Sequence, residues 1–278
     1  MRIEFLKMQG LGNDFLVFDA PAAAADAQLD SSRLRALADR HTGVGFDQAL
    51  MLETPRDAGS RVYYRIFNSD GSEVEQCGNG ARCIAALLYA RAPELGRDLV
   101  MGSPGGSVRA HVAEDGMVSV DMGVPNFDPR SLPMVADAEA PTYSLSFDGV
   151  AVEIGAVSMG NPHAVLRVPD VKAAPIGQFG PSIERHPRFP KRANVGFMQV
   201  VDRGHVRLRV YERGVGETLA CGTGACAAVA VGRRSGLLDA EVRVDLPGGT
   251  AWVSWGAEDE PVWLTGPATT VFTGSIDI

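Results

Sequence analysis

The fold is decided by two matching stretches, Gln76-Cys77-Gly78-Asn79-Gly80-Ala81-Arg82-Cys83 and Ala220-Cys221-Gly222-Thr223-Gly224-Ala225-Cys226. In each, a cysteine precedes alternating glycines and an alanine-rich apolar run, which predicts a glycine-rich turn opening into a helix. The first amides of a helix carry partial positive charge, and glycine lets that backbone approach an anion closely. An ordinary thiol has a pKa of about 8.5, and a helix N-terminus commonly lowers it. We therefore expect reactive thiols at Cys77 and Cys221.

The similarity between the two halves of the chain extends beyond these cysteines. Without a gap, Arg65 aligns with Arg209 and Glu73 with Glu217. Two further matches come in the same order: Gly12-Asn13 with Gly160-Asn161, and Val44-Gly45-Phe46 plus Gln48 with Val195-Gly196-Phe197 plus Gln199. Two copies of this length predict two related domains rather than a repeat solenoid.

Helical and strand-like patterns alternate in both halves. The runs Gly80–Arg91 and Ala225–Arg234 are apolar nearly all round, as in helices surrounded by protein. Ser31–His41 predicts a further helix. Strand-like runs are 3–8, 15–18, 62–67, 107–112, 117–122, 150–155, 164–168, 241–246, 251–255 and 262–265, and the tail at 271–274 is expected to pair back onto a sheet. The predicted class is α+β: a barrel-like sheet around a central helix, twice.

A proline-rich, acidic segment places the boundary between the domains. It runs from Pro125 to Pro141, so we expect a junction near Val124. The predicted domains are residues 1–123 with 266–278, carrying Cys77, and residues 124–265, carrying Cys221.

Composition narrows the function classes. The chain has 278 residues and a net charge of -8, which argues against a nucleic-acid surface and favours a small-molecule partner. The N-terminus shows no leader pattern and no stretch is long enough to span a bilayer, so we expect no membrane association and a cytoplasmic location. Cysteine spacing and scattered histidines predict no metal site. Two disulfides remain an alternative, but they would leave the glycines after Cys77 and Cys221 unexplained.

Two ionisable thiols in equivalent places suggest a specific chemistry. If a thiolate and a thiol face one ligand, the first can take a proton from a carbon while the second delivers one to the opposite face. The helix N-termini would hold the substrate carboxylate and stabilise the developing charge. The lysines, Lys7, Lys172 and Lys191, all lie outside the thiol motifs, so a mechanism without pyridoxal phosphate fits better.

The motifs resemble those of the diaminopimelate epimerase family. The resemblance rests on Asn68–Arg82, on Glu212–Thr218 followed by Cys221–Gly224, and on the shorter motifs Gly10–Phe15, Gly45–Gln48 and Gly160–His163, so it covers both halves. It implies the family's fold of two homologous domains, related by pseudo-twofold symmetry with the active site in the cleft. The implied activity is the cofactor-independent interconversion of LL- and meso-2,6-diaminopimelate by a homodimer, in lysine and peptidoglycan precursor biosynthesis.

The same resemblance implies roles for individual residues. Cys77 and Cys221 would be the acid–base pair, His163 and Glu212 would tune the thiols, and Phe272 would contribute to dimerisation. The implied substrate-binding residues are Asn13, Gln48, Asn68, Gly78, Asn79, Asn161, Asn194, Glu212, Arg213, Gly222 and Thr223.

Positions at which the halves differ suggest where the symmetry is broken. Asn68 aligns with Glu212 and Ser69 with Arg213, so we hypothesise that Glu212 and Arg213 read the distal amino and carboxylate groups of the substrate. An Arg beside a Glu in a loop is otherwise a solvated pair of little energetic value. Taken alone, His163 would be interpreted as a core histidine and Phe272 as a core residue.

Three other readings remain open. A proline racemase shares the two-domain plan and the paired cysteines, although the polar set around Glu212 and Arg213 favours a longer substrate. Isomerases of the phenazine-biosynthesis type resemble this fold but lack the two thiols. A thiol redox module would instead close Cys77 and Cys221 reversibly into a disulfide.

Overall fold

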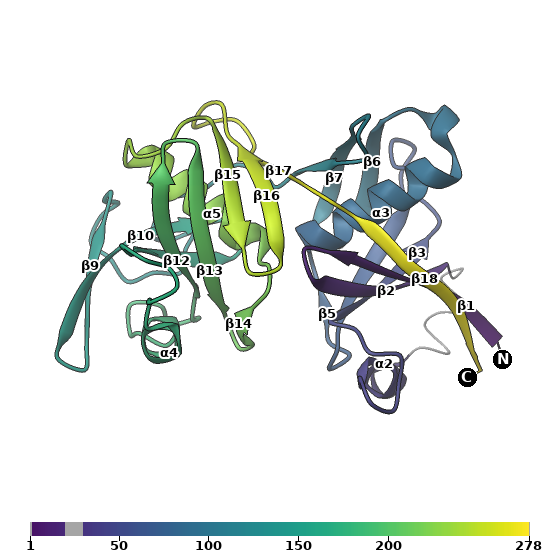
Figure 1. The fold of residues 1–278 in the computed structure, drawn as a ribbon, viewed down its shortest axis with the longest axis horizontal. Helices are drawn as coiled ribbons and strands as arrows, with labels where there is room; N and C mark the ends of the chain where they lie inside the picture. The colour runs from purple at the N-terminus through teal and green to yellow at the C-terminus, as the bar shows by residue number, and fades with distance from the viewer. Residues whose placement is uncertain (1, 20–29, 278) are drawn as a thin grey trace. The chain divides into compact units, whose positions relative to one another are not determined.

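A computed structural model describes residues 2–19 and 30–277 of the chain. Contacts between residues divide it into two compact units: Met1–Val120 with Gly266–Ile278, and Asp121–Thr265. The sequence placed this junction near Val124, a few residues later. Each unit is a curved sheet with one long helix packed against it (Figure 1).

The first unit winds its strands around helix α3 (Gly78–Arg91). Its pairing order is β18 (Thr269–Asp277), β1 (Arg2–Gly10), β2 (Asn13–Asp19), β3 (Gln48–Glu53), β4 (Tyr63–Asn68), β6 (Asp98–Ser103), β7 (Gly106–Val112) and β8 (Val118–Asp121). The short β5 (Glu73–Val74) also pairs with β4, and η1 (Pro93–Leu95) follows α3. The parallel pair β2/β3 is joined through α2 (Ser31–Ala38), since parallel neighbours need a crossover.

The second unit repeats this order around helix α5 (Gly222–Arg234). It runs β9 (Tyr143–Phe147), β10 (Val150–Ser158), β11 (Pro162–Arg167), β12 (Asn194–Asp202), β13 (His205–Glu212), β15 (Glu241–Leu246), β16 (Gly249–Ser254) and β17 (Trp263–Gly266), with β14 (Gly216–Thr218) on β13. Helix α4 (Ile176–Glu184) joins the parallel pair β11/β12. In Figure 1, α5 lies behind β12 and β13.

Ion pairs show that the two units share more than topology. Arg65 pairs with Glu73 at 2.7 Å, and Arg209 pairs with Glu217 at 2.6 Å, in each case from the long strand to the short one beside it. The alignment of these residues from sequence is therefore confirmed.

The alignment of Val44-Gly45-Phe46 with Val195-Gly196-Phe197 is wrong. The first triplet precedes β3, whereas the second lies inside β12. Leu50 is opposite Ile66, and Gly196 is opposite Val210, the residue equivalent to Ile66. By this register the counterpart of Gln48 is Asn194 rather than Gln199. The alignment rested on a short match between common residues, and the strand register contradicts it.

Three helices begin or end at positions other than those predicted from the sequence. Cys77 and Cys221 are the N-cap residues of α3 and α5, so both helices begin earlier than the apolar runs alone predicted. The helix predicted to reach His41 ends at Ala38, because the Asp39 carboxylate accepts hydrogen bonds from the His41 and Thr42 amides.

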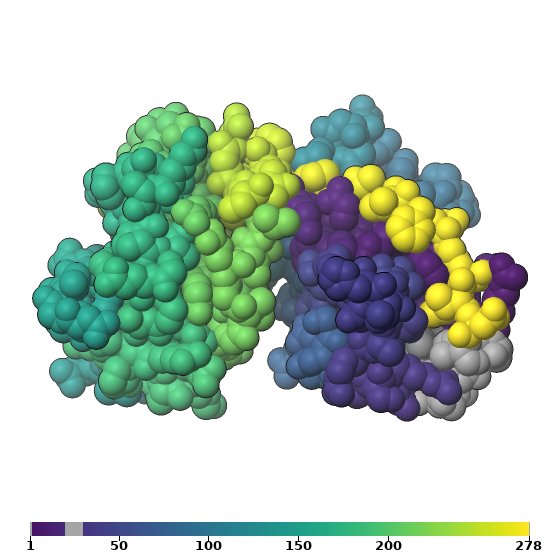
Figure 2. All heavy atoms as spheres, turned by 60° about the horizontal axis from the view of Figure 1, so that its bottom comes forward, coloured from purple at the N-terminus to yellow at the C-terminus, as the bar shows by residue number. Residues whose placement is uncertain are grey.

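The C-terminal strand β18 pairs antiparallel with β1, which confirms the predicted return of the tail to a sheet. It lies on the surface of the first unit, drawn in yellow in Figure 2. Val271 and Phe272 on it are 56% and 47% exposed, and the Phe272 ring meets Phe5 edge-on at 6.0 Å. Within the described ranges, no helix is long and apolar enough to cross a membrane.

Candidate functional site

In the first unit, Cys77 stands at the opening of α3 beside two asparagines. Its Sγ lies 3.9 Å from Asn13 Oδ1, and Asn79 Nδ2 donates to the same oxygen at 3.2 Å. Asn79 Oδ1 in turn accepts from the buried guanidinium of Arg82 at 2.8 Å. The thiol, one turn of helix and the start of β2 thus meet at one point.

Charged groups behind Asn13 fix the direction of its amide. Asn13 Nδ2 donates to Asp47 Oδ2 at 3.0 Å, and a carboxylate can only accept, so Asn13 Oδ1 must face Cys77 and Asn79. Asp47 is held by Arg40, which also pairs with Asp14 at 2.8 Å. Burial alone would raise the pKa of Asp14, but hydrogen bonds from Arg40 and Lys7 outweigh it and hold that pKa well below its usual range.

Two further candidates lie at the same edge of the first sheet. Gln48 begins β3 next to Phe15 of β2, and its Nε2 donates to Asn68 Oδ1 at the end of β4, at 3.0 Å. Asn68 also donates to Ser72 Oγ at 3.2 Å. The strand ends carrying Asn13, Gln48 and Asn68 are therefore adjacent.

In the second unit, Cys221 is surrounded by a matching but distinct set. The thiol is 5% exposed and lies 3.6 Å from Thr223 Oγ1. Asn161 Nδ2 donates to that hydroxyl at 3.3 Å, and Asn161 Oδ1 is 2.9 Å from His163 Nε2. A chain of contacts therefore connects His163 to the thiol through Asn161 and Thr223.

Burial and charge tune the groups of this second cluster. Burial, and then the nearby Glu212 carboxylate, raise the pKa of Cys221 well above its ordinary value, although Thr223 and the Gly224 amide work against them. Thr218 donates a short hydrogen bond to Glu212. Burial, followed by the charge of Arg213, lowers the pKa of His163 to about 3, so this imidazole is neutral at neutral pH.

The equivalent asparagines turn opposite ends of their amides toward the thiols. Asn13 presents its oxygen beside Cys77, because Asp47 takes its nitrogen. Asn161 presents its nitrogen beside Thr223 and Cys221, with its oxygen facing His163. Related folds thus carry different hydrogen-bonding chemistry at corresponding points.

Asn194 and Arg213 are joined through the backbone. Asn194 is 4% exposed, accepts from the Arg213 amide at 2.9 Å and donates to Pro162 O at 3.3 Å, so both ends of its amide bind protein. The exposed Arg213 side chain donates to Lys191 O at 3.2 Å.

The candidates fall into two groups, one in each unit. The first comprises Asn13, Gln48, Asn68, Cys77, Gly78 and Asn79, and the second comprises Asn161, His163, Asn194, Glu212, Arg213, Cys221, Gly222 and Thr223. Phe272 belongs to neither, since it lies on the outer surface of β18. Sequence reasoning missed Asp47 and Thr218, although both stand inside motifs that it quoted.

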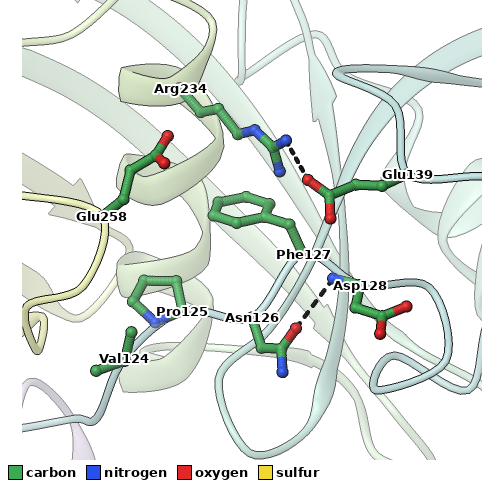
Figure 3. A pocket seen from close by; sticks show the side chains of 8 residues that line it. All are labelled: Val124, Pro125, Asn126, Phe127, Asp128, Glu139, Arg234 and Glu258. Carbon is green, nitrogen blue, oxygen red and sulfur yellow. Dashed lines mark hydrogen bonds and ion pairs between the residues drawn. The ribbon is translucent and has the colours of Figure 1, made fainter.

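The remaining cysteines, acidic residues and surface pockets of the described residues offer no second candidate site. All four cysteines are free thiols, and over residues 2–19 and 30–277 no cluster of His, Cys, Asp and Glu could hold a metal ion. A surface pocket of the second unit is lined by Val124–Asp128, Glu139, Arg234 and Glu258 (Figure 3). Its arginine already pairs with Glu139 and stacks 4.2 Å from the Phe127 ring centre, so it is engaged within the protein.

Comparison with known proteins identifies close sequence relatives. A family model described as "Diaminopimelate epimerase" matches residues 5–127 and 155–271. Proteins of that name from Thioalkalivibrio sulfidiphilus and Nitrosomonas europaea are 57% and 53% identical to this chain, over the full length of both partners.

Solved structures with similar folds are more distant in sequence. A PhzF-family phenazine biosynthesis protein of Bacillus anthracis matches with a TM-score of 0.68 at 16% identity, covering all of both chains. A hydroxyproline epimerase of Agrobacterium vitis also reaches 0.68, at 15% identity, covering 99% of this chain and 92% of the other. At such identity these matches support the shared fold alone.

Proposed function

The chain belongs to the diaminopimelate epimerase family, and from this membership we propose that it interconverts LL- and meso-2,6-diaminopimelate without a cofactor. It would serve lysine and peptidoglycan precursor biosynthesis in the cytoplasm, on a free small molecule. The relatives favour neither a proline racemase nor a thiol redox module. The observation that carries the proposal is that Cys77 and Cys221 are both N-cap residues of helices opened by glycine.

The proposed reaction moves two protons and no electrons. A thiolate takes the α-proton from one face of the substrate, and the other thiol gives its proton to the opposite face, so the carbon is inverted and the thiols exchange protonation states. The first amides of α3 and α5 would bind the substrate carboxylate and stabilise the charge that develops as the α-proton leaves.

The surroundings of Cys221 suggest how the free enzyme is poised. Burial and Glu212 raise the pKa of Cys221, so this thiol holds its proton at neutral pH. A two-base inversion needs one thiolate, and we assign that state to Cys77, which is less buried. In this assignment the free enzyme is ready to use Cys77 as the base and Cys221 as the acid. The reverse reaction uses the two thiols in the opposite roles.

The remaining polar residues are proposed to hold the two ends of the substrate. Asn13, Gln48, Asn68, Gly78, Asn79, Asn161, Asn194, Gly222 and Thr223 would bind it around the thiols, directly or by positioning their neighbours. Asn13 directs its amide oxygen toward Cys77 and Asn79, and this oxygen could also accept from the ammonium group of a substrate. Glu212 would bind the distal amino group and Arg213 the distal carboxylate group of the substrate, because opposite charges attract. His163 would act on Cys221 through Asn161 and Thr223.

We also propose a homodimer formed through β18. The strand lies on the surface of the first unit with Val271 and Phe272 exposed, and large exposed apolar side chains favour a protein contact.

Variants of all four cysteines test the proposed function. Cys77→Ala and Cys221→Ala should each lower kcat by roughly a thousandfold, because each removes one acid–base group. Cys83→Ala and Cys226→Ala are matched controls in the same helices, and should leave kcat near the wild-type value. Burial raises the pKa of Cys83 to about 12, so this thiol does not ionise at neutral pH. Comparable losses in all four variants, or full activity without Cys77 or Cys221, would count against the proposal.

A further inference from the structure

A buried carboxylate, Glu184, lies under the turn that carries Glu212 and Arg213. Its side chain is 1% exposed, at the last residue of α4. One carboxylate oxygen accepts from the Gly214 amide at 2.9 Å. Arg185 and Arg192 provide its charge partners, at 3.4 Å and 3.7 Å.

The turn above Glu184 is held through consecutive backbone amides. Asn194 accepts from the Arg213 amide at 2.9 Å, and Glu184 accepts from the next amide, that of Gly214. The backbone carbonyl of Glu184 also accepts from Ala193 at 3.2 Å, which fixes the residue before Asn194. Glu184 therefore supports both hydrogen bonds that fix the Arg213 turn. Its side chain accepts from Gly214, and its backbone carbonyl fixes the residue before Asn194.

Several features of this arrangement are unfavourable in themselves. A buried carboxylate loses its hydration, and a negative charge at a helix C-terminus opposes the helix dipole. Its partner Arg192 adopts a positive φ of 60°, an uncommon backbone conformation for a residue other than glycine. Such features cluster where a functional site needs them.

We infer that Glu184 is a positioning residue that aims Arg213 at the distal end of the substrate and thereby helps to set specificity. The inference rests on the proposed function, in which Arg213 reads a distal charged group. Glu184 touches no reacting atom; it acts by holding the Gly214 amide, and so the direction in which the Arg213 side chain leaves the turn.

The test separates positioning from stability. Glu184→Ala should raise KM for diaminopimelate roughly tenfold with little change in kcat, because it weakens a remote binding contact and leaves the thiols intact. Glu184→Gln keeps an acceptor for the Gly214 amide and should behave like wild type. Hydrogen exchange of the peptide 211–217, followed by mass spectrometry, should be faster in Glu184→Ala and unchanged in Glu184→Gln.

A matched control is Glu53→Ala in the first unit. Glu53 is 3% exposed and is paired with Arg56 and Arg65, which belong to the first unit, whereas the Arg213 turn belongs to the second. This variant should leave KM unchanged. Equal effects of Glu53→Ala and Glu184→Ala on KM, or faster exchange in Glu184→Ala with an unchanged KM, would overturn the inference.

Two further variants keep the outcomes distinct. If Glu184→Ala does not fold, Glu184→Asp removes one methylene, draws the carboxylate away from Gly214, and should show the same rise in KM. Arg213→Ala should raise KM at least as much as Glu184→Ala does. An unchanged KM in Arg213→Ala would refute the proposed role of Arg213, while the exchange measurement would still decide whether Glu184 holds the turn.

Discussion

At the scale of single residues, Cys77 and Cys221 occupy equivalent positions in different electrostatic surroundings. Cys221 is buried near the Glu212 carboxylate, and both factors raise its pKa. Cys77 stands partly exposed beside an amide oxygen that Asp47 holds in place. In the proposed two-base reaction, this difference would leave the proton of the free enzyme on Cys221 and the thiolate at Cys77.

The effect of Glu212 on Cys221 can be measured by alkylation. Glu212→Gln removes the negative charge, so the pKa of Cys221 should fall and its thiolate should be more abundant at any pH below that pKa. Alkylation of Cys221 by iodoacetamide at pH 8, followed by peptide mass spectrometry, should become several-fold faster, since the thiolate is the nucleophile.

Glu217→Gln provides the control for this measurement. Glu217 lies on the neighbouring strand β14 and pairs with Arg209, so its loss should leave the alkylation rate of Cys221 unchanged. If Glu212→Gln slows alkylation or leaves it unchanged, Glu212 does not hold the proton on Cys221.

At the scale of elements, β18 joins the end of the chain to its beginning. The strand pairs with β1 from Arg2↔Asp277 to Gln9↔Thr269, and it carries the exposed Val271 and Phe272. The Phe272 ring packs on Phe5 and is still 47% exposed. A partner covering Phe272 would bury its remaining apolar surface.

Phe272→Asp tests the proposed dimer interface. A charge on this face should oppose association, so sedimentation equilibrium should show a dimer for the wild-type chain and a monomer for the variant. Val201→Asp is the control: Val201 is 42% exposed on β12 in the second unit, and its replacement should leave the dimer intact. A wild-type monomer, or a variant that still dimerises, would contradict the assignment.

Elements defined by local chemistry were predictable from sequence, whereas equivalences set by strand register and single contacts between distant residues were not. The glycines after Cys77 and Cys221 indicated both long helices, and the constant spacing to the thiols indicated that Arg65 and Glu73 correspond to Arg209 and Glu217, which the two ion pairs confirm. The equivalence of Gln48 and Asn194 needed the strand register, because the preceding loops differ in length. Glu184 gave no sequence signal, since thirty residues separate it from Gly214.

At the scale of the whole molecule, the two units share one fold but differ in the residues around their thiols. Both units present a thiol at the start of a buried helix, beside an asparagine at a strand end. Only the second adds Glu212 and Arg213 at the positions of Asn68 and Ser69. A reaction that treats both faces of one carbon alike, on a substrate with a distinct far end, needs this combination of symmetry and difference.

The most direct test of two-base epimerisation is an NMR time course with the reduced protein and LL-diaminopimelate in D2O, without pyridoxal phosphate. The meso isomer should appear with deuterium at the inverted α-carbon, because the donating thiol has exchanged its proton with solvent. No α-deuterium and no meso product from the folded, reduced protein would contradict two-base epimerisation.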